Sequence, residues 1–81
     1  MFEEKIEVIA YSGYRGEEIP RTILLHGKKI EVFEILSQWI EERSDDRERK
    51  RFYKIKGSDG VLHMIYYDEK AMEWFHIHQP R

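Results

Sequence analysis

Apolar and polar residues alternate along much of this chain, a pattern that is typical of half-buried β-strands. The alternation runs from Lys5 to Tyr11 and again from Arg21 to His26, which predicts two strands. The segment Gly27-Lys28-Lys29 supplies a turn, after which a third strand begins at Ile30. Two glycines and a proline between residues 12 and 20 predict a loop that connects the first two strands.

The segment that follows Ile30 fits two kinds of element. Five of its apolar residues have the spacing of an amphipathic helix: Val32, Ile35, Leu36, Trp39 and Ile40. No N-cap residue precedes them, however, and Ile30 to Phe33 includes strong strand formers. A bulge after Val32 would bring the later apolar residues into register on a bent strand. We therefore favour a bent strand, with a helix from about Val32 to Glu42 as the alternative.

Charge dominates the next stretch of the chain. Ten of the eleven residues from Glu41 to Arg51 are charged, five of each sign. No apolar side chain is available there to anchor the segment to a core. An exposed, mobile loop at about residues 41–51 is therefore predicted.

The region from Phe52 to His78 predicts a three-stranded antiparallel meander. Its first turn is Ser58-Asp59-Gly60, because Asp and Gly accept the backbone geometry of a tight turn, and its second is a four-residue loop closed by Asp68 and Glu73. In this register three pairs face each other: Tyr67 with Trp74, Ile65 with His76, and His63 with His78. The side chains expected to fill the core are Val61, Ile65, Tyr67 and Trp74.

Composition narrows the class of protein. Eighty-one residues make one domain, 1–81. Charged residues are 37% of the chain but nearly cancel, to a net charge of −2, which argues against a strongly basic nucleic-acid binder. There is no cysteine, no signal-peptide pattern in the first residues and no apolar run of roughly 20 residues, so we expect a cytoplasmic location and no membrane partner. The predicted fold is mainly β, with five to six antiparallel strands forming a curved sheet or an open SH3-like barrel or roll.

Several residues of this pattern also match a known family. They are Pro20 to Val32, Glu34-Ile35-Leu36, Trp39, Phe52-Tyr53-Lys54-Ile55, Asp59-Gly60, Tyr66, Asp68 and Trp74. Through them the chain resembles a family of short, uncharacterised bacterial β-rich domains, related in pattern to the C-terminal tail of a translesion-DNA-synthesis accessory protein. The resemblance covers residues 20–76, implies a strand from Ile30 to Trp39, and brings no catalytic residues with it.

The chain departs from the family pattern at three positions. Met72 stands where the family tends to have glycine, so either Met72 adopts the left-handed backbone conformation or the loop changes its shape. His63 and His76 stand where the family favours a tyrosine and an aliphatic residue.

Three histidines share one face of the last hairpin in the predicted register: His63, His76 and His78. Neutral imidazole is a common metal donor, so one interpretation is a zinc site. The other is that His63 and His76 are partly buried and hydrogen-bonded, because no cysteine or well-placed carboxylate completes a four-ligand site. We favour the second interpretation and expect neither a cofactor nor a metal.

Two groups of residues are candidates for binding a protein partner or a second copy of the chain. The first is Tyr11, Tyr14 and Arg15 on the glycine-containing loop, since tyrosine and arginine offer large contact areas with a polar handle. The second is the other face of the last hairpin: Leu62, Met64, Tyr66, Phe75 and Ile77. A strongly curved sheet could bury that face by closing into a barrel, and otherwise the face marks a partner surface or a homodimer.

A basic segment, 47–56, is the candidate for nucleic-acid contact. Its residues are Arg47, Arg49, Lys50, Arg51, Tyr53 and Lys54, a phosphate-contacting stripe with one aromatic residue. Acidic residues in the same segment lie within a Debye length and cancel much of its field.

No motif of a known catalytic centre occurs in the sequence. A Gly-x-Ser-x-Gly elbow, a phosphate loop and a His-Glu-x-x-His pair are all missing, and no cysteine can act as a nucleophile. We therefore predict a non-enzymatic interaction module that binds a protein partner or itself. A nucleic-acid-binding module linked to DNA repair or replication is the alternative.

Overall fold

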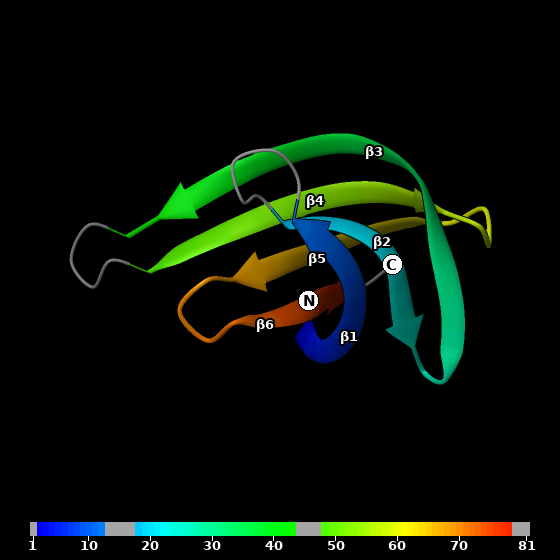
Figure 1. The fold of residues 1–81 in the computed structure, drawn as a ribbon, viewed down its shortest axis with the longest axis horizontal. Helices are drawn as coiled ribbons and strands as arrows, with labels where there is room; N and C mark the ends of the chain where they lie inside the picture. The colour runs from blue at the N-terminus through cyan, green and yellow to red at the C-terminus, as the bar shows by residue number, and fades with distance from the viewer. Residues whose placement is uncertain (1, 13–17, 44–47, 79–81) are drawn as a thin grey trace.

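Six strands account for most of the residues that the computed structural model describes, which are 2–12, 18–43 and 48–78. They are β1 (Phe2–Ser12), β2 (Glu18–Leu25), β3 (Lys28–Glu42), β4 (Arg49–Gly57), β5 (Leu62–Asp68) and β6 (Glu73–His78). Each strand pairs antiparallel with the next, and β1 also pairs with β6, so that the sheet closes into a small barrel (Figure 1). The predicted mainly β, SH3-like class is confirmed, with the barrel closed. None of the described residues forms a helix long and apolar enough to cross a membrane.

The long strand β3 bends, as its sequence predicts. Its first residues pair with β2 and the remainder pairs with β4, so the strand turns from one side of the barrel to the other (Figure 1). Its register against β4 shifts between Val32 and Glu34 and again between Ile35 and Ser37, which marks two β-bulges. The helix alternative is therefore wrong. Its apolar spacing arises because each bulge changes which residues of the strand face inward.

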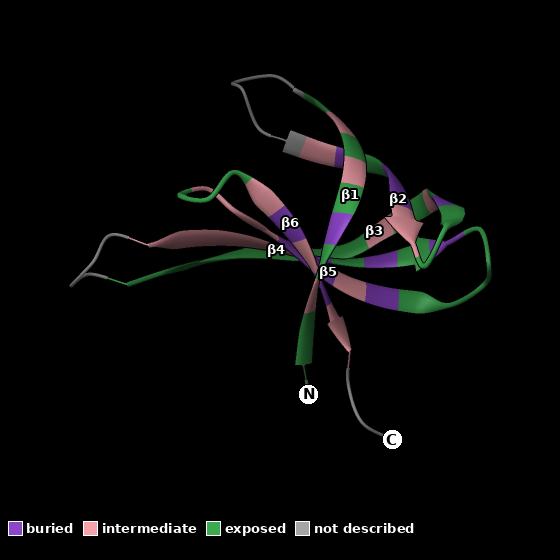
Figure 2. Cartoon of the chain, turned by 90° about the horizontal axis from the view of Figure 1, so that it is seen from below, coloured by how far each residue is buried: buried purple, intermediate pink, exposed green. Residues whose placement is uncertain are grey.

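The inner face of the barrel holds a small apolar core to which all six strands contribute. Its buried members are Ile6, Ile23, Ile30, Tyr53, Ile55, Ile65 and Trp74. Figure 2 shows the buried segments, in purple, gathered where the strands cross. Tyr67 packs against this core, as predicted, but the prediction for Val61 is wrong because its side chain is 51% exposed. Val61 still belongs to the turn, where its N–H donates to Asp59 Oδ1, and β5 begins one residue later.

The C-terminal meander has the predicted register. Tyr67 lies opposite Trp74, and Ile65 lies opposite His76. The second turn is closed by the pairing of Asp68 with Glu73, also as predicted. The short turns thus fix which side chains of β5 and β6 face inward.

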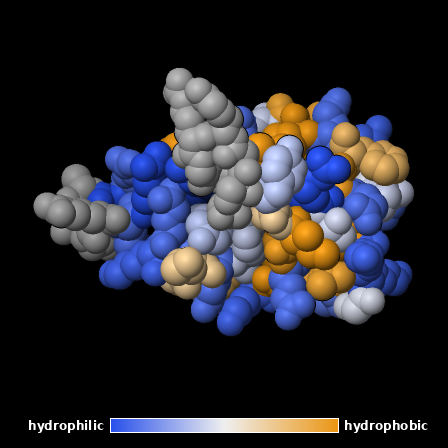
Figure 3. All heavy atoms as spheres, in the orientation of Figure 1, coloured by the Kyte–Doolittle hydropathy of each residue, from blue (hydrophilic) through white to orange (hydrophobic). Residues whose placement is uncertain are grey.

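The charged segment 41–51 is a strand pair over most of its length, so the predicted loop is too long. β3 continues to Glu42 and β4 begins at Arg49, and residues 44–47 lie outside the described part. Opposite charges face each other across the pair: Glu42 Oε1 lies 3.3 Å from Arg49 Nε, and Glu41 is opposite Lys50. Such pairs stabilise a sheet without any apolar anchor. Figure 3 shows polar residues, in blue, covering this end of the molecule at the left.

Two non-glycine residues of the described chain have a positive φ, and both lie in turns. His26, with φ 51°, and Gly27, with φ 78°, form the two-residue turn between β2 and β3, which is typical of type I′ hairpins. Met72, with φ 57°, ends the turn between β5 and β6, where its N–H donates to the carbonyl oxygen of Asp68 at 2.7 Å. Of the two alternatives predicted for Met72, the left-handed conformation is the one observed.

Replacing Met72 with glycine should stabilise the protein by about 0.5–1 kcal/mol, because glycine adopts a positive φ without the steric cost of a Cβ. The Met72 side chain is 75% exposed, so little packing is lost with it. The free energy of unfolding in urea measures the effect. Met72→Ala is the control, since it keeps the Cβ and should bring no gain. An equal response of both variants would contradict the role given to the backbone.

Candidate metal centre

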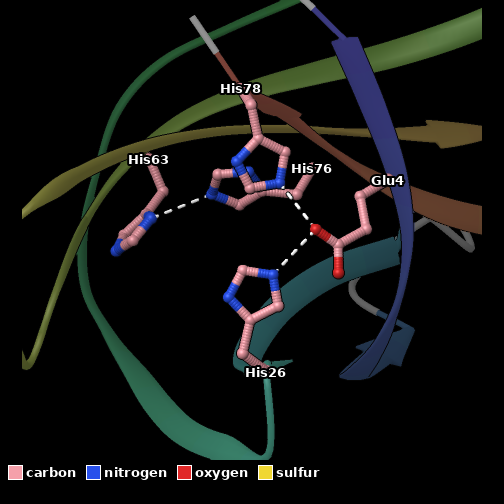
Figure 4. Close-up of polar contacts among 5 residues, drawn as sticks. All are labelled: Glu4, His26, His63, His76 and His78. Atoms are coloured by element: carbon pink, nitrogen blue, oxygen red, sulfur yellow. Dashed lines mark hydrogen bonds and ion pairs between the residues drawn. The ribbon is translucent and has the colours of Figure 1, made fainter.

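All four histidines of the chain lie next to one another (Figure 4). The ring centroids of His63 and His76 are 5.2 Å apart, those of His76 and His78 are 4.3 Å apart, and those of His78 and His26 are 5.9 Å apart. Glu4 lies among them. Polar side chains seldom concentrate beside the core of so small a barrel, which makes this cluster the candidate functional site.

The outer part of the cluster consists of Glu4, His26 and His78. Glu4 Oε1 lies 2.9 Å from His26 Nε2 and 2.8 Å from His78 Nε2. All three donor atoms lie within 4.8 Å of one another. The His26 side chain is exposed, and a surface hollow of about 490 Å³ borders Glu4 and His26. An ion can therefore approach Glu4 and His26 from solvent.

Three separate elements place these side chains. Glu4 lies on β1 and His78 ends β6, and they approach each other because Phe2 pairs with His78 and Glu4 pairs with His76. The Phe2 ring stacks on His78 with centroids 4.5 Å apart, which fixes the plane of that imidazole. His26 comes from the β2–β3 turn, whose left-handed backbone directs it to Glu4.

The inner part of the cluster is a chain of hydrogen bonds from Asp59 through His63 to His76. His63 Nε2 lies 2.9 Å from Asp59 Oδ2, and His63 Nδ1 lies 3.0 Å from His76 Nε2. A carboxylate only accepts, so we assign the proton to His63 Nε2, and its Nδ1 then accepts from the Nε2–H of His76. This assignment leaves His76 Nδ1 as a buried lone pair, without a hydrogen-bond partner among the described residues.

Contacts with the imidazoles set the charge of both carboxylates. The hydrogen bond from His26 lowers the pKa of Glu4, as does the one from His78, against an opposing effect of burial. Burial also acts to raise the pKa of Asp59, but hydrogen bonds from a backbone N–H and from His63 outweigh it, and the pKa is lowered. Both groups are therefore ionised at neutral pH, which is the state that binds metal.

The structure brings together a different donor set from the one in the disfavoured zinc interpretation of the sequence, which is His63, His76 and His78. His63 and His76 are buried and bonded to each other, in agreement with the favoured interpretation. His78, however, turns to Glu4 and His26. The expectation that no well-placed carboxylate is available is wrong, because closure of the barrel brings Glu4 to the histidines.

Glu4 and His26 are the residues that sequence reasoning misses. Glu4 is one of several acidic residues near the N-terminus, and only the pairing of β1 with β6 distinguishes it. His26 carries a local signal: it stands before Gly27, at a turn position where asparagine is the usual residue. A histidine there is a departure that could have singled it out.

The predicted partner-binding loop is described only at its start. Tyr11 is 46% exposed at the end of β1, and the guanidinium of Arg21 lies 5.3 Å from the centroid of its ring. Tyr14 and Arg15 lie outside the described residues.

The predicted apolar face of the last hairpin lies on the outside of the closed barrel. It continues across β4 and β3 as a row of rings, in which Trp39 stacks on Phe52, Phe52 contacts Tyr66, and Tyr66 stacks on Phe75. We call this surface the outer face; its residues are Trp39, Phe52, Leu62, Met64, Tyr66, Phe75 and Ile77. Closure does not bury it completely, since Leu62 remains 54% exposed and Trp39 38% exposed.

The residues predicted to contact nucleic acid do not share one surface. Tyr53 is only 4% exposed and packs against Trp74 in the core, so its inclusion among the nucleic-acid-contacting residues is wrong. The alternation of β4 explains this, because Tyr53 and Ile55 face inward while Lys54 faces out. The ammonium of Lys50 lies 5.2 Å from the centroid of the Tyr66 ring.

The arginines of the same segment form ion pairs. Arg49 Nε and Arg51 Nε lie 3.4 and 2.7 Å from the same carboxylate oxygen of Glu69. Arg47 lies outside the described residues. A nucleic-acid phosphate would have to compete with Glu69 for both guanidinium groups.

The buried His76 predicts that the metal-free protein loses stability in mild acid. Burial, together with the neighbouring His78 and His63, lowers the pKa of His76 to about 4 from its ordinary value of 6.5. Between these values the unfolded chain binds a proton that the folded chain does not. The contribution of His76 to stability is therefore constant above about pH 6.5 and falls by about 1–3 kcal/mol on acidification to about pH 4.

Urea unfolding in EDTA at several pH values measures this loss, and the His76→Gln variant should show a flatter profile. An NMR titration of the folded wild-type protein gives the same quantity directly. A His76 imidazole that titrates near pH 6.5 in the folded state would contradict the prediction.

Comparison of the chain with protein-family models, with curated proteins and with solved structures finds no match. The resemblance to short bacterial β-rich domains therefore stays a prediction. The function of the cluster has to be inferred from its own geometry.

Proposed function

We propose that this protein binds a divalent transition-metal ion, Zn²⁺ foremost, through Glu4 Oε1, His26 Nε2 and His78 Nε2. The observation that carries the proposal is the convergence of these three donors within 4.8 Å of one another. They come from β1, from the β2–β3 turn and from β6, so no single hairpin brings them together.

The donor set suits a borderline metal. Two imidazoles and one carboxylate are a recognised ligand combination for Zn²⁺, with bonds of about 2.0–2.2 Å. Mg²⁺ and Ca²⁺ instead prefer six or more oxygen ligands. The nitrogen donors His26 and His78 therefore favour a transition metal over either of them.

The two distances from Glu4 Oε1 to the imidazole nitrogens are close to those of an occupied site. In a tetrahedral site with bonds of 2.0–2.1 Å, two ligand atoms are roughly 3.3 Å apart. The two nitrogens lie 2.9 and 2.8 Å from Glu4 Oε1, at hydrogen-bond distance. An ion that replaces the two protons needs each nitrogen to move away from the oxygen by only about half an ångström.

The contacts of His26 support a functional role for its side chain. In the left-handed conformation, glycine or asparagine would cost less free energy than histidine. The His26 side chain is 65% exposed, so packing does not explain its presence. Met72 has the same backbone conformation, so the distinguishing feature of His26 is its side chain, which contacts Glu4 and stacks on His78.

Zinc should raise the melting temperature of the wild-type protein, because it binds the closed barrel and not the unfolded chain. At a free Zn²⁺ concentration of 100 Kd the gain is about 2.7 kcal/mol, or about 10–20 °C for a domain of this size. EDTA should reverse it. His26→Asn is the decisive variant, since asparagine suits the turn but removes a donor. We expect the metal-free variant to melt at or above the wild-type temperature and to lose most of the response to zinc.

Two results would contradict the proposal. One is a wild-type melting temperature that does not change between EDTA and excess Zn²⁺. The other is a zinc response in His26→Asn as large as that of the wild type, which would place the ion elsewhere. Glu4→Gln, which removes the negative charge from the same site, should weaken the response as well.

A second candidate function is self-association through the outer face. Its apolar band is flanked by Lys54 and Lys56 of β4 on one side. On the other side lie Glu3, Lys5 and Glu73, and Lys5 Nζ is 3.5 Å from Glu73 Oε1. A two-fold axis through the band would set the lysines of one copy against the glutamates of the other. This complementarity favours a second copy over nucleic acid as the occupant.

Sedimentation velocity over a range of protein concentrations tests the second candidate. The wild type should pass from monomer to dimer as concentration rises, and Leu62→Glu should shift that transition at least tenfold upward, by about 1.4 kcal/mol or more. Val61→Glu is the matched control, because Val61 is exposed to a similar extent (51% against 54%) but lies off the outer face. A monomer at every concentration, or equal effects of both variants, would contradict this use of the face.

A further inference from the structure

We infer that His76 Nδ1 is the fourth protein donor of the metal site, and that Asp59 and His63 keep this atom free to bind. The inference rests on the metal site proposed above and deepens it. It assigns a role to the inner half of the cluster, which the three-ligand site does not use.

Three protein ligands leave one position of a tetrahedral ion open. Structural zinc sites close that position with a fourth protein donor. Two observations place His76 next to the proposed site. It lies opposite Glu4 in the β1–β6 pairing, and its ring centroid is 4.3 Å from that of His78.

The Nδ1 atom of His76 is a donor without another use. The side chain is only 6% exposed, and Nδ1 has no hydrogen-bond partner among the residues that the structure describes. Buried polar atoms are nearly always paired in folded proteins. A metal ion would supply the missing partner.

The bonds behind His76 determine that Nδ1 is a lone pair and not an N–H group. Asp59 accepts from His63 Nε2, His63 Nδ1 accepts from His76 Nε2, and the proton of His76 is thereby held on Nε2. Metal-binding histidines usually donate their other N–H to a carboxylate or carbonyl, which fixes the tautomer. Here an extra imidazole stands between the ligand and the carboxylate. Asp59 and His63 are thus positioning residues.

The ion must draw His76 inward for this bond to form. His76 is not one of the three residues whose donor atoms lie within 4.8 Å of one another, whereas a Zn–N bond is about 2.0–2.1 Å long. His76 and His78 are two residues apart on β6 and so project from the same side of the strand. The inference therefore requires a side-chain adjustment within the cluster and no change of the fold.

Long-range ¹H–¹⁵N NMR of the histidine rings tests this on the wild-type protein, first in EDTA and then with one equivalent of Zn²⁺. In EDTA, His76 should carry its proton on Nε2. With zinc, His26 and His78 should move their protons from Nε2 to Nδ1, because their Nε2 atoms bind the ion. His76 should keep its tautomer while its Nδ1 resonance shifts to the metal-bound range.

The outcomes separate the two proposals. If zinc switches His26 and His78 but leaves His76 Nδ1 unchanged, the three-ligand site stands and the fourth donor is wrong, with a water molecule as the alternative partner of Nδ1. If none of the rings responds to zinc, both proposals fail. A proton on His76 Nδ1 in EDTA would overturn the positioning role of Asp59 and His63.

A pair of matched variants tests the positioning role independently. Asp59→Asn removes the carboxylate that orders the chain of protons, and we expect Zn²⁺ affinity to fall about tenfold. Asp68→Asn is the control, because Asp68 accepts a backbone N–H in the neighbouring hairpin turn just as Asp59 does in its own. Equal zinc affinities of the two variants, measured by competition with a chromophoric chelator, would overturn it.

Discussion

The pairing of β1 with β6 is the constraint on which the rest of the structure depends. This pairing runs from Phe2 opposite His78 to Ile6 opposite Trp74. It closes the six-stranded sheet into a barrel, so that one face of the sheet becomes the interior. A chain of this length buries only about 60% of its unfolded surface, so it has little apolar area to lose. Without the pairing of β1 with β6, Ile6 and Trp74 would separate, and the inner face of the sheet would lose its packing partners. Closure of the barrel therefore determines which apolar residues form the core and which polar residues are buried beside them.

The closed barrel buries two histidines, and their burial does not favour folding. His63 and His76 occupy inward positions on β5 and β6, next to the isoleucines of the core. Burying an imidazole costs free energy that only a complete set of hydrogen bonds offsets, and His76 Nδ1 lacks one. Departures from consistent apolar packing are expected where a site has a use beyond folding. Two of the three buried polar residues among those that the structure describes, His63 and His76, belong to the histidine cluster.

Local patterns were sufficient for most of the fold, and long-range pairing was needed for the site. The bulge after Val32 and the register of Tyr67 with Trp74 follow from rules that span a few residues. The alternation of inward and outward residues along β4 also predicts that Tyr53 lies in the core, although the basic residues around it suggest an exposed, charged segment. Glu4 is different. It meets His78 across 74 positions of the chain, and no periodicity near either residue signals that contact.

The pairing of β1 with β6 and the proposed metal site would form one thermodynamic unit. An ion bound by Glu4, His26 and His78, as proposed, would link β1, the β2–β3 turn and β6, so its binding free energy would also stabilise the closed barrel. Linkage makes this reciprocal: a barrel that is already closed presents the donors preassembled and binds the ion more tightly. The same reasoning explains why the donors are spread over three elements. Ligands on a single hairpin could bind a metal whether or not the barrel is closed. Ligands on three elements can bind it well only when the barrel is closed.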